Sequence, residues 1–189
     1  MELTPGPNMG YLAIVSSRWG WASGMATIIG VTAGLAVYLL ASVFGLAEIV
    51  LRVRWLFELL RWAGVAYLIW LAWDTWRGEA GLAATDERRP GAGALMARGF
   101  LANVLNPKVA VFYIALLPGF TDPARDFARQ ALTLGLLHIG VSVVIHAGIV
   151  TAGAHAAGVL GRADSKVVRA GFALALLAIA LWLAWDTRA

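Results

Sequence analysis

The sequence has no cysteine, and only 14% of its 189 residues are charged. The missing cysteine excludes disulfide bonds, thiol redox chemistry and metal sites built on thiolates. Soluble domains carry about 25% charged residues, so the low charge argues against an ordinary soluble domain. Apolar residues are abundant instead, at 60% of the chain with a mean hydropathy of +0.75. This composition is that of an integral membrane protein.

Enzyme signatures are also missing. The chain has no His-Glu-x-x-His motif, no Gly-x-Ser-x-Gly motif and no carboxylate pair at membrane depth. Its histidines have no nearby acid or cysteine that would complete a metal site. We therefore expect no enzymatic activity, no metal and no cofactor. The basic residues cluster between apolar segments, which indicates a lipid bilayer as partner and not a nucleic acid.

Long apolar runs divide the chain into about six segments, most of them close to the roughly 20 residues that a membrane-spanning helix needs. Continuous apolar runs predict helices, because barrel strands alternate apolar and polar residues. The predicted fold is an all-α integral membrane protein with one transmembrane domain over residues 1–189. The apolar segments cover residues 3–17, 22–47, 55–76, 99–121, 131–160 and 167–185.

A polar stretch at residues 79–93 is the only plausible linker, and it separates half-repeats 1–78 and 94–189. Lys and Arg residues in loops favour the cytoplasmic side of a membrane. The linker side carries eight of them against six on the opposite side, when Arg61 and Arg98 are counted as loop residues. The linker is therefore predicted to be cytoplasmic.

The hexapeptide Trp-Leu-Ala-Trp-Asp-Thr occurs twice, at residues 70–75 and 182–187, and each copy ends the third span of its half. Each half also has a proline-broken first span, at residues 4–8 (Thr-Pro-Gly-Pro-Asn) and 106–108 (Asn-Pro-Lys). Halves with three spans each must have opposite orientations. The pattern predicts two inverted three-helix repeats, the architecture of many secondary transporters.

Lys108 is the only charged residue between Arg98 and Asp122. It lies about ten residues beyond Arg98, which is about 15 Å of helix and close to the bilayer midplane. A cation at this depth costs about 2.5 kcal/mol or more, and the adjacent Pro107 breaks the helix. A buried charge beside broken backbone predicts a polar cavity at the midplane.

Several motifs in register over nearly the whole chain resemble those of the LysE/RhtB family of amino-acid exporters. The matching positions are residues 4–8, Gly30, Gly34, Tyr38 and residues 63–73, 98–103, 106–108, 112–113 and 117–118. The resemblance implies a secondary transporter in the bacterial plasma (inner) membrane, with several spans. It further implies export of amino acids or close derivatives, driven by the proton-motive force.

One departure from the family concerns the first helix. The family has an apolar half-helix ahead of the Thr-Pro-Gly-Pro-Asn motif, whereas residues 3–17 give only about 22 Å of helix against a core of ~30 Å. We expect either a start codon further upstream or a truncated first helix.

An amino-acid exporter must hold both a carboxylate and an ammonium. Helix ends opened by proline present N–H groups to anions and carbonyls to cations, and asparagine both donates and accepts. Lys108 is expected near the substrate carboxylate or a neighbouring acid. The candidate substrate-binding residues are Pro5, Gly6, Pro7, Asn8, Tyr38, Tyr67, Asn103, Asn106, Pro107 and Lys108.

His138 is a candidate for proton coupling, since imidazole titrates near neutral pH. His146 lies eight residues further on and shares roughly the same helix face. Asp74 and Asp186 are alternative gates or proton sites at opposite faces of the membrane. A structural role is the competing interpretation for each of them, as an interior polar residue or an interfacial one.

Two further alternatives concern the whole chain. A channel or a structural membrane subunit without coupled transport would have a similar composition. The Gly30-x-x-x-Gly34 spacing is typical of close helix packing, either inside one chain or between two protomers. A homodimer is therefore among the expected assemblies, together with protons and a small-molecule substrate as partners.

Overall fold

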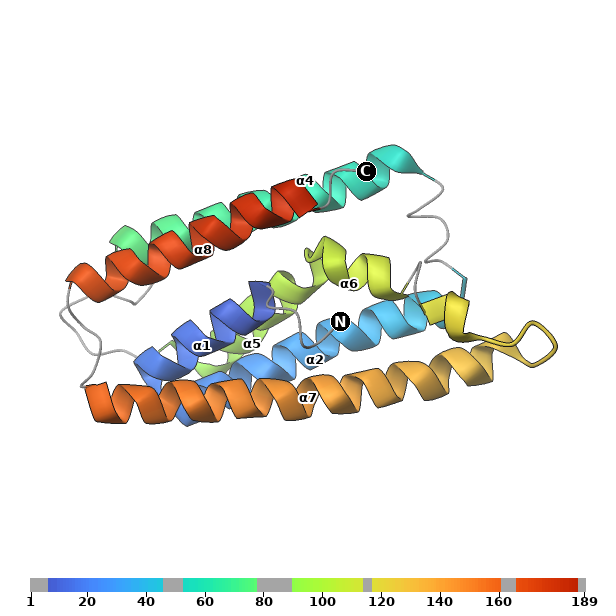
Figure 1. Ribbon diagram of the computed structural model, residues 1–189, viewed down its shortest axis with the longest axis horizontal. Helices are drawn as coiled ribbons and strands as arrows, with labels where there is room; N and C mark the ends of the chain where they lie inside the picture. Colours follow the sequence, from blue (N-terminus) through green and yellow to red (C-terminus); the bar gives the residue numbers. More distant parts are fainter. Residues whose placement is uncertain (1–6, 46–52, 78–89, 114–116, 161–165, 187–189) are drawn as a thin grey trace.

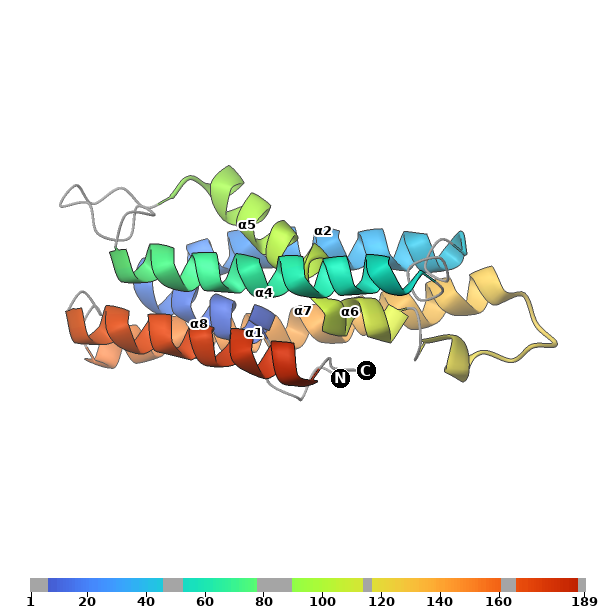
Figure 2. The ribbon, with the colours of Figure 1, turned by 90° about the horizontal axis from the view of Figure 1, so that it is seen from above.

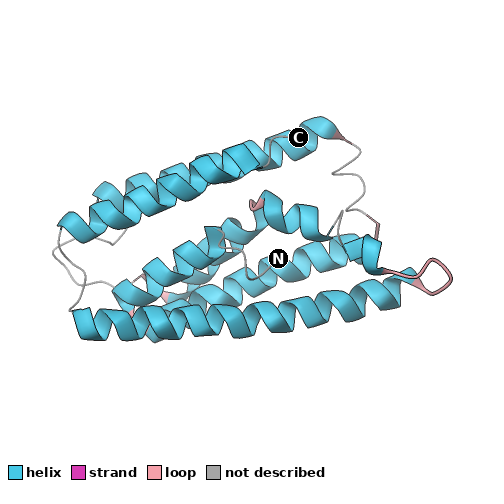
Figure 3. Cartoon of the chain, in the orientation of Figure 1, coloured by secondary structure: helices cyan, strands magenta, loops and turns pink. Residues whose placement is uncertain are grey.

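The computed structural model describes residues 7–45, 53–77, 90–113, 117–160 and 166–186. Within these ranges the chain is helical and contains no strand, as predicted from its apolar runs (Figure 3). The helices are α1 (Pro7–Trp19), α2 (Trp21–Val43), α4 (Arg54–Arg77), α5 (Ala92–Val104), α6 (Pro107–Val111), the 3-10 helix η2 (Leu117–Phe120), α7 (Phe127–Leu160) and α8 (Lys166–Asp186).

The helices form an elongated bundle with two parts. The antiparallel helices α4 and α8 pack on each other along one side, and α1, α2, α5 and α7 form the other side (Figures 1 and 2). Helix α2 contacts both α5 and α7, and α1 packs on α7 and α2. The short helix α6 lies between the two parts and continues the direction of α5 toward the opposite end of the bundle (Figure 1).

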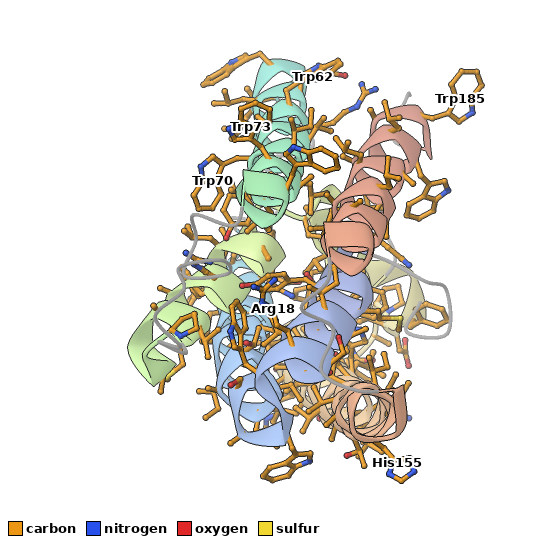
Figure 4. All side chains as sticks on the ribbon, turned by 90° about the vertical axis from the view of Figure 1, so that its left-hand side faces the viewer. Arg18, Trp62, Trp70, Trp73, His155 and Trp185 are labelled. Carbon is orange, nitrogen blue, oxygen red and sulfur yellow. The ribbon has the colours of Figure 1, made fainter. Side chains whose placement is uncertain are left out.

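Two of the helices are long and apolar enough to cross a bilayer, namely Trp21–Val43 and the Phe127–Ala156 part of α7. A shorter apolar stretch, Ala173–Trp182, lies within α8. The outer surface is also apolar, because large hydrophobic side chains stay exposed along α4, α7 and α8. Trp62, Trp70, Trp73 and Trp185 point outward from α4 and α8 (Figure 4), as expected of a surface covered by lipid.

Gly30 and Gly34 of α2 face α5 at very short range. A Cβ atom at Gly30 would meet the backbone carbonyl of Met96, and one at Gly34 would lie 2.7 Å from Oδ1 of Asn103. A Cβ atom at Gly99 of α5 would likewise meet the Thr27 carbonyl. The Gly-x-x-x-Gly spacing therefore serves an internal interface between α2 and α5.

Two arginines do not lie where the loop count placed them. Arg61 is buried within α4, where Nη1 lies 3.1 Å from Oε2 of Glu58 and Nη2 donates a 2.6 Å hydrogen bond to the carbonyl of Ala184 in α8. Arg98 is half-buried within α5. The interpretation of both as loop residues was wrong, because acceptors in the neighbouring helix support the Arg61 guanidinium at a buried position.

Candidate functional site

The predicted helix break lies between α5 and α6. Helix α5 ends at Val104, and α6 begins at Pro107 with Asn106 as its N-cap residue. Asn106 has extended backbone angles, and its Oδ1 accepts the N–H of Lys108 at 3.1 Å. Proline fits the first helical position, where no amide donor is needed. The sequence Asn-Pro-Lys therefore both stops one helix and starts the next.

Side chains of α2 donate to the carbonyl that the break leaves free and to a second carbonyl just beyond α6. In an unbroken helix the Lys108 N–H would bond to the Val104 carbonyl. Here the Tyr38 hydroxyl donates to that carbonyl at 2.7 Å, and Oγ of Ser42 donates to the Tyr113 carbonyl at 3.1 Å just beyond α6. Away from water, unpaired backbone groups are costly. Tyr38 thus stabilises the break, and a direct contact of its hydroxyl with substrate stays a prediction.

Two buried asparagine side chains near the break have atoms without hydrogen-bond partners. Asn103 of α5 is fully buried with both its amide N and O unpartnered, and Asn8 of α1 is 7% exposed with its Oδ1 unpartnered. A buried polar atom left unpaired costs about 1–3 kcal/mol. Native proteins keep few such groups, and those that remain call for an explanation. Binding of a polar ligand is an explanation that fits here.

These two asparagines belong to helix ends that meet in the middle of the molecule. In both ribbon views α1 begins close to the level at which α5 ends and α6 begins (Figures 1 and 2). Helix α1 contacts α5, and the Asn103 side chain lies directly against Gly34 of α2. Asn8 stands in the first turn of α1. Pro7 and Pro107, the first residues of α1 and α6, thus both lie beside the same central region of the molecule.

Lys108 is half-buried at the second position of α6. Its Nζ lies 5.9 Å from the centroid of the Trp182 ring in α8. Trp70, the first residue of the other hexapeptide copy, stands 5.9 Å from Cζ of Arg98. Each copy of the hexapeptide thus places its first tryptophan over a cation from residues 92–111. Such contacts stabilise a cation by about 0.5–2 kcal/mol.

Tyr67 of α4 lies on the α5 side of this region. Its hydroxyl donates to the carbonyl of Arg98 at 3.2 Å, and its ring stacks on Trp70 with the centroids 5.7 Å apart. These contacts join α4 to α5 beside the arginine. A role of Tyr67 in substrate binding stays a prediction.

The acids of the two hexapeptides are not brought together. Asp74 lies near the end of α4 and Asp186 ends α8, and the two helices run antiparallel (Figure 1). The hydrogen bond from Arg61 to Ala184 sets the register, so that Asp186 lies about 15 residues, or about 22 Å, from the level of Asp74. The side chains of Asp74 and Asp186 lie outside the part of the structure that is described, as do Pro5 and Gly6. Their predicted roles stay untested.

His138 of α7 is held in an aromatic cluster. Its Nδ1 lies 3.1 Å from the Tyr113 hydroxyl, and its ring stacks on Phe112 with centroids 4.0 Å apart. Tyr113 is fully buried and stacks in turn on Tyr38. The contacts link α7 to the end of α6 and to α2. They match the structural interpretation of His138 as a hydrogen-bonded interior residue, and its proton-coupling role stays a prediction.

Ser42, Tyr113 and Arg61 were not among the candidate residues. The partner of each is far along the chain: 71 residues separate Ser42 from Tyr113, and 123 residues separate Arg61 from Ala184. A polar residue in an apolar run was the only available signal. That signal marks such positions without showing what they contact.

Known proteins are similar to this chain over most of its length. A family model described as LysE type translocator matches residues 1–187. A homoserine/homoserine lactone efflux protein of Salmonella typhimurium is 35% identical over 156 residues, which cover 80% of this chain and 74% of that protein. An uncharacterized membrane protein of Vibrio cholerae serotype O1 is 34% identical over 145 residues, which cover 75% of this chain and 71% of that protein. No solved structure matches the chain. The helix break, the paired tryptophan motifs and these similarities lead to one conclusion: the chain belongs to the LysE type translocator family.

Proposed function

We propose that this protein is a secondary transporter that exports small amino acids or close derivatives, with homoserine and its lactone as first candidates. The family membership and the names of the Salmonella relatives support efflux. The observation that carries the proposal is a pair of buried asparagines with unpartnered amide atoms, Oδ1 of Asn8 and both Oδ1 and Nδ2 of Asn103, beside a capped helix break. A polar substrate would satisfy amide atoms that the protein itself leaves unpaired.

The chemistry of these residues suits a zwitterion. The Asn8 and Asn103 oxygens accept hydrogen bonds from a substrate ammonium. The Lys108 ammonium attracts the carboxylate, and the N-terminal turn of α1 adds N–H groups and a partial positive charge. The substrate therefore lies between the start of α1 and the break in the fourth apolar segment. Protons moving inward drive the export.

The proposed architecture is a single transmembrane domain of two inverted repeats, residues 1–78 and 94–189, joined by a cytoplasmic linker at 79–93. Three features support it: α4 and α8 pack antiparallel, α2 packs on α7, and Pro7 and Pro107 begin corresponding helices. The protein would cross the bacterial inner membrane several times. A homodimer is also expected, although the Gly30 and Gly34 face does not serve it because α5 covers that face.

The test is efflux from liposomes that contain the purified full chain and labelled homoserine. An inward proton gradient should accelerate homoserine release several-fold over the rate without a gradient. Release that follows the substrate gradient alone would instead support the alternative of a channel, and no release at all would contradict export of homoserine.

A pair of variants tests the site. Asn103→Leu keeps the branched shape and removes the amide, and should slow efflux about tenfold or more. Thr133→Val makes a similar polar-to-apolar change at an exposed position of α7 and should leave efflux unchanged. Equal rates for the two variants would remove Asn103 from the site.

A further inference from the structure

His146 is the most deeply buried of the three histidines. It is 3% exposed, whereas His138 is half-buried and His155 is exposed. Its Nδ1 lies 3.4 Å from Oγ of Ser142, one turn earlier on α7, and that contact is buried as well. Histidine is the side chain whose ordinary pKa lies closest to neutral pH, so it is suited to bind and release a proton.

The register of α7 against α1 places His146 at the level of the proposed substrate site. The two helices run in the same direction (Figure 1), and a Cβ atom at Gly153 would meet Oγ of Ser16 and lie 3.1 Å from the Ala13 carbonyl. His146 lies two helical turns before Gly153, on the same face. Two turns before Ser16 lies the first turn of α1, and this turn contains Asn8. His146 is therefore level with the unpartnered oxygen of Asn8.

Helix α2 covers His146 from the other side. It runs antiparallel to α7 (Figure 1), and a Cβ atom at Gly24 would lie 2.5 Å from Val150, while Leu39 lies against Gly135. These two contacts bracket His146 and place it level with the buried Ile28. Ile28 packs with Leu12 and Val150 in an apolar cluster. Apolar side chains of α1 and α2 therefore lie beside this part of α7.

The charged and titratable groups of the neighbouring elements lie elsewhere. In α1 they are Tyr11, which packs toward α4 and α8, and Arg18, which lies at the far end of the helix. In α2 the only such residue is Tyr38, which stacks on Tyr113. Neither α1, α2 nor η2 therefore places a fixed charge at the level of His146 among the residues described. A cation bound at this level would be weakly screened.

We infer that His146 binds the coupling proton, and that it does so in competition with the ammonium group of the substrate. The inference rests on the proposed export of amino acids. Two positive charges at one level between α1 and α7 disfavour each other in a medium of low dielectric. A proton from the external water binds the imidazole after the substrate leaves Asn8. It passes to the cytoplasmic water when the next ammonium arrives, so one cation is exchanged for another.

The same reasoning separates His146 from His138. His138 lies eight residues earlier, about 12 Å along α7. Its ring is stacked on Phe112 and bonded to the Tyr113 hydroxyl, far from the first turn of α1. His138 therefore provides a matched control on the same helix.

The experiment compares His146→Gln with His138→Gln in liposomes, using two assays with homoserine. Counterflow, the exchange of labelled for unlabelled homoserine without a proton gradient, needs no proton step. His146→Gln should keep counterflow within about threefold of the unsubstituted chain and lose the acceleration of efflux by a proton gradient. His138→Gln should retain both activities. A His146→Gln variant that still responds to the gradient, or that loses counterflow as well, overturns the inference.

A second measurement does not depend on the folding of a variant. Homoserine added to the unsubstituted protein in weakly buffered detergent solution at about pH 6 should release protons, because ammonium binding displaces the proton from the imidazole. Absence of proton release in a protein that shows counterflow overturns the role of His146 and leaves the export proposal intact. Absence of counterflow in the unsubstituted chain contradicts the export proposal itself.

Discussion

The Tyr38 hydroxyl donates a 2.7 Å hydrogen bond to the carbonyl of Val104, the last residue of α5. The helical donor for that carbonyl would be the Lys108 N–H, which instead bonds to the Asn106 side chain. The Tyr38 hydroxyl of α2 thus bonds the last carbonyl of α5, and the Asn106 side chain bonds the Lys108 N–H in α6. Together these two bonds stabilise the separation of α5 from α6. This arrangement makes the break a stable element of the fold, available for a binding site.

Tyr38→Phe should destabilise the protein by about 1–2 kcal/mol, because the Val104 carbonyl loses its donor in a part-buried position. Tyr67→Phe is the matched control: its hydroxyl donates to the Arg98 carbonyl within α5, where the helix supplies a backbone donor too. Reversible unfolding in mixed micelles measures both variants. Equal losses would show that the Val104 bond has no special weight.

Gly30→Ala should destabilise the chain by about 1–3 kcal/mol or more, since the new methyl group would meet the backbone of Met96, which cannot rotate away. Gly140 lies in the middle of α7, and a methyl group added there would meet no neighbour within 4 Å. Gly140→Ala should therefore be neutral or stabilise the chain by up to about 1 kcal/mol. Thermal unfolding of the two purified variants tests the difference. A stable Gly30→Ala protein would contradict the close contact of α2 with α5.

The helices and the break could be predicted because their causes are local. Apolar runs indicate helices, and Asn106 followed by Pro107 is a capping sequence that ends one helix and begins another. The Gly30 and Gly34 spacing indicated close packing for the same reason. Its partner, α5, could not be predicted, since the contact depends on how helices distant in sequence cross.

The placement of charged and titratable residues was harder to predict. Arg61 was taken for a loop residue because its acceptor, the Ala184 carbonyl, lies in another helix. His138 was the candidate for proton coupling, and the spacing of eight residues showed only that His146 shares roughly its helix face. Their surroundings differ because Phe112 and Tyr113, just beyond α6, pack on the first, whereas α1 and α2 enclose the second.

Lys108→Met should discriminate between two substrates that differ at one group. Homoserine carries a carboxylate, whereas its lactone has that group closed into an ester and keeps only the ammonium. Loss of a charged hydrogen bond of about 1.5–3 kcal/mol would raise the KM for homoserine about tenfold to a hundredfold and leave the lactone within about twofold. Concentration-dependent efflux of both compounds from liposomes measures the ratio.

The control for that change is Arg98→Met. Arg98 is also half-buried and also lies over a hexapeptide tryptophan, Trp70, but it stands six residues before the end of α5. Its removal should leave the ratio of the two KM values unchanged. A similar loss for homoserine and lactone in Lys108→Met would contradict a contact between Lys108 and the carboxylate.

Asn106 offers a last distinction, between capping the helix and binding substrate. Its Oδ1 accepts the Lys108 N–H, a bond that serine at the same position can also make. If capping is its main task, Asn106→Ser keeps efflux close to that of the unsubstituted chain, and Asn106→Ala loses about 0.5–2 kcal/mol of stability together with much of the efflux. We expect this outcome, because the amide oxygen is already engaged with the backbone whereas those of Asn8 and Asn103 are not. Efflux that falls equally in the two variants while only Asn106→Ala unfolds more easily would instead assign the Asn106 amide to the substrate.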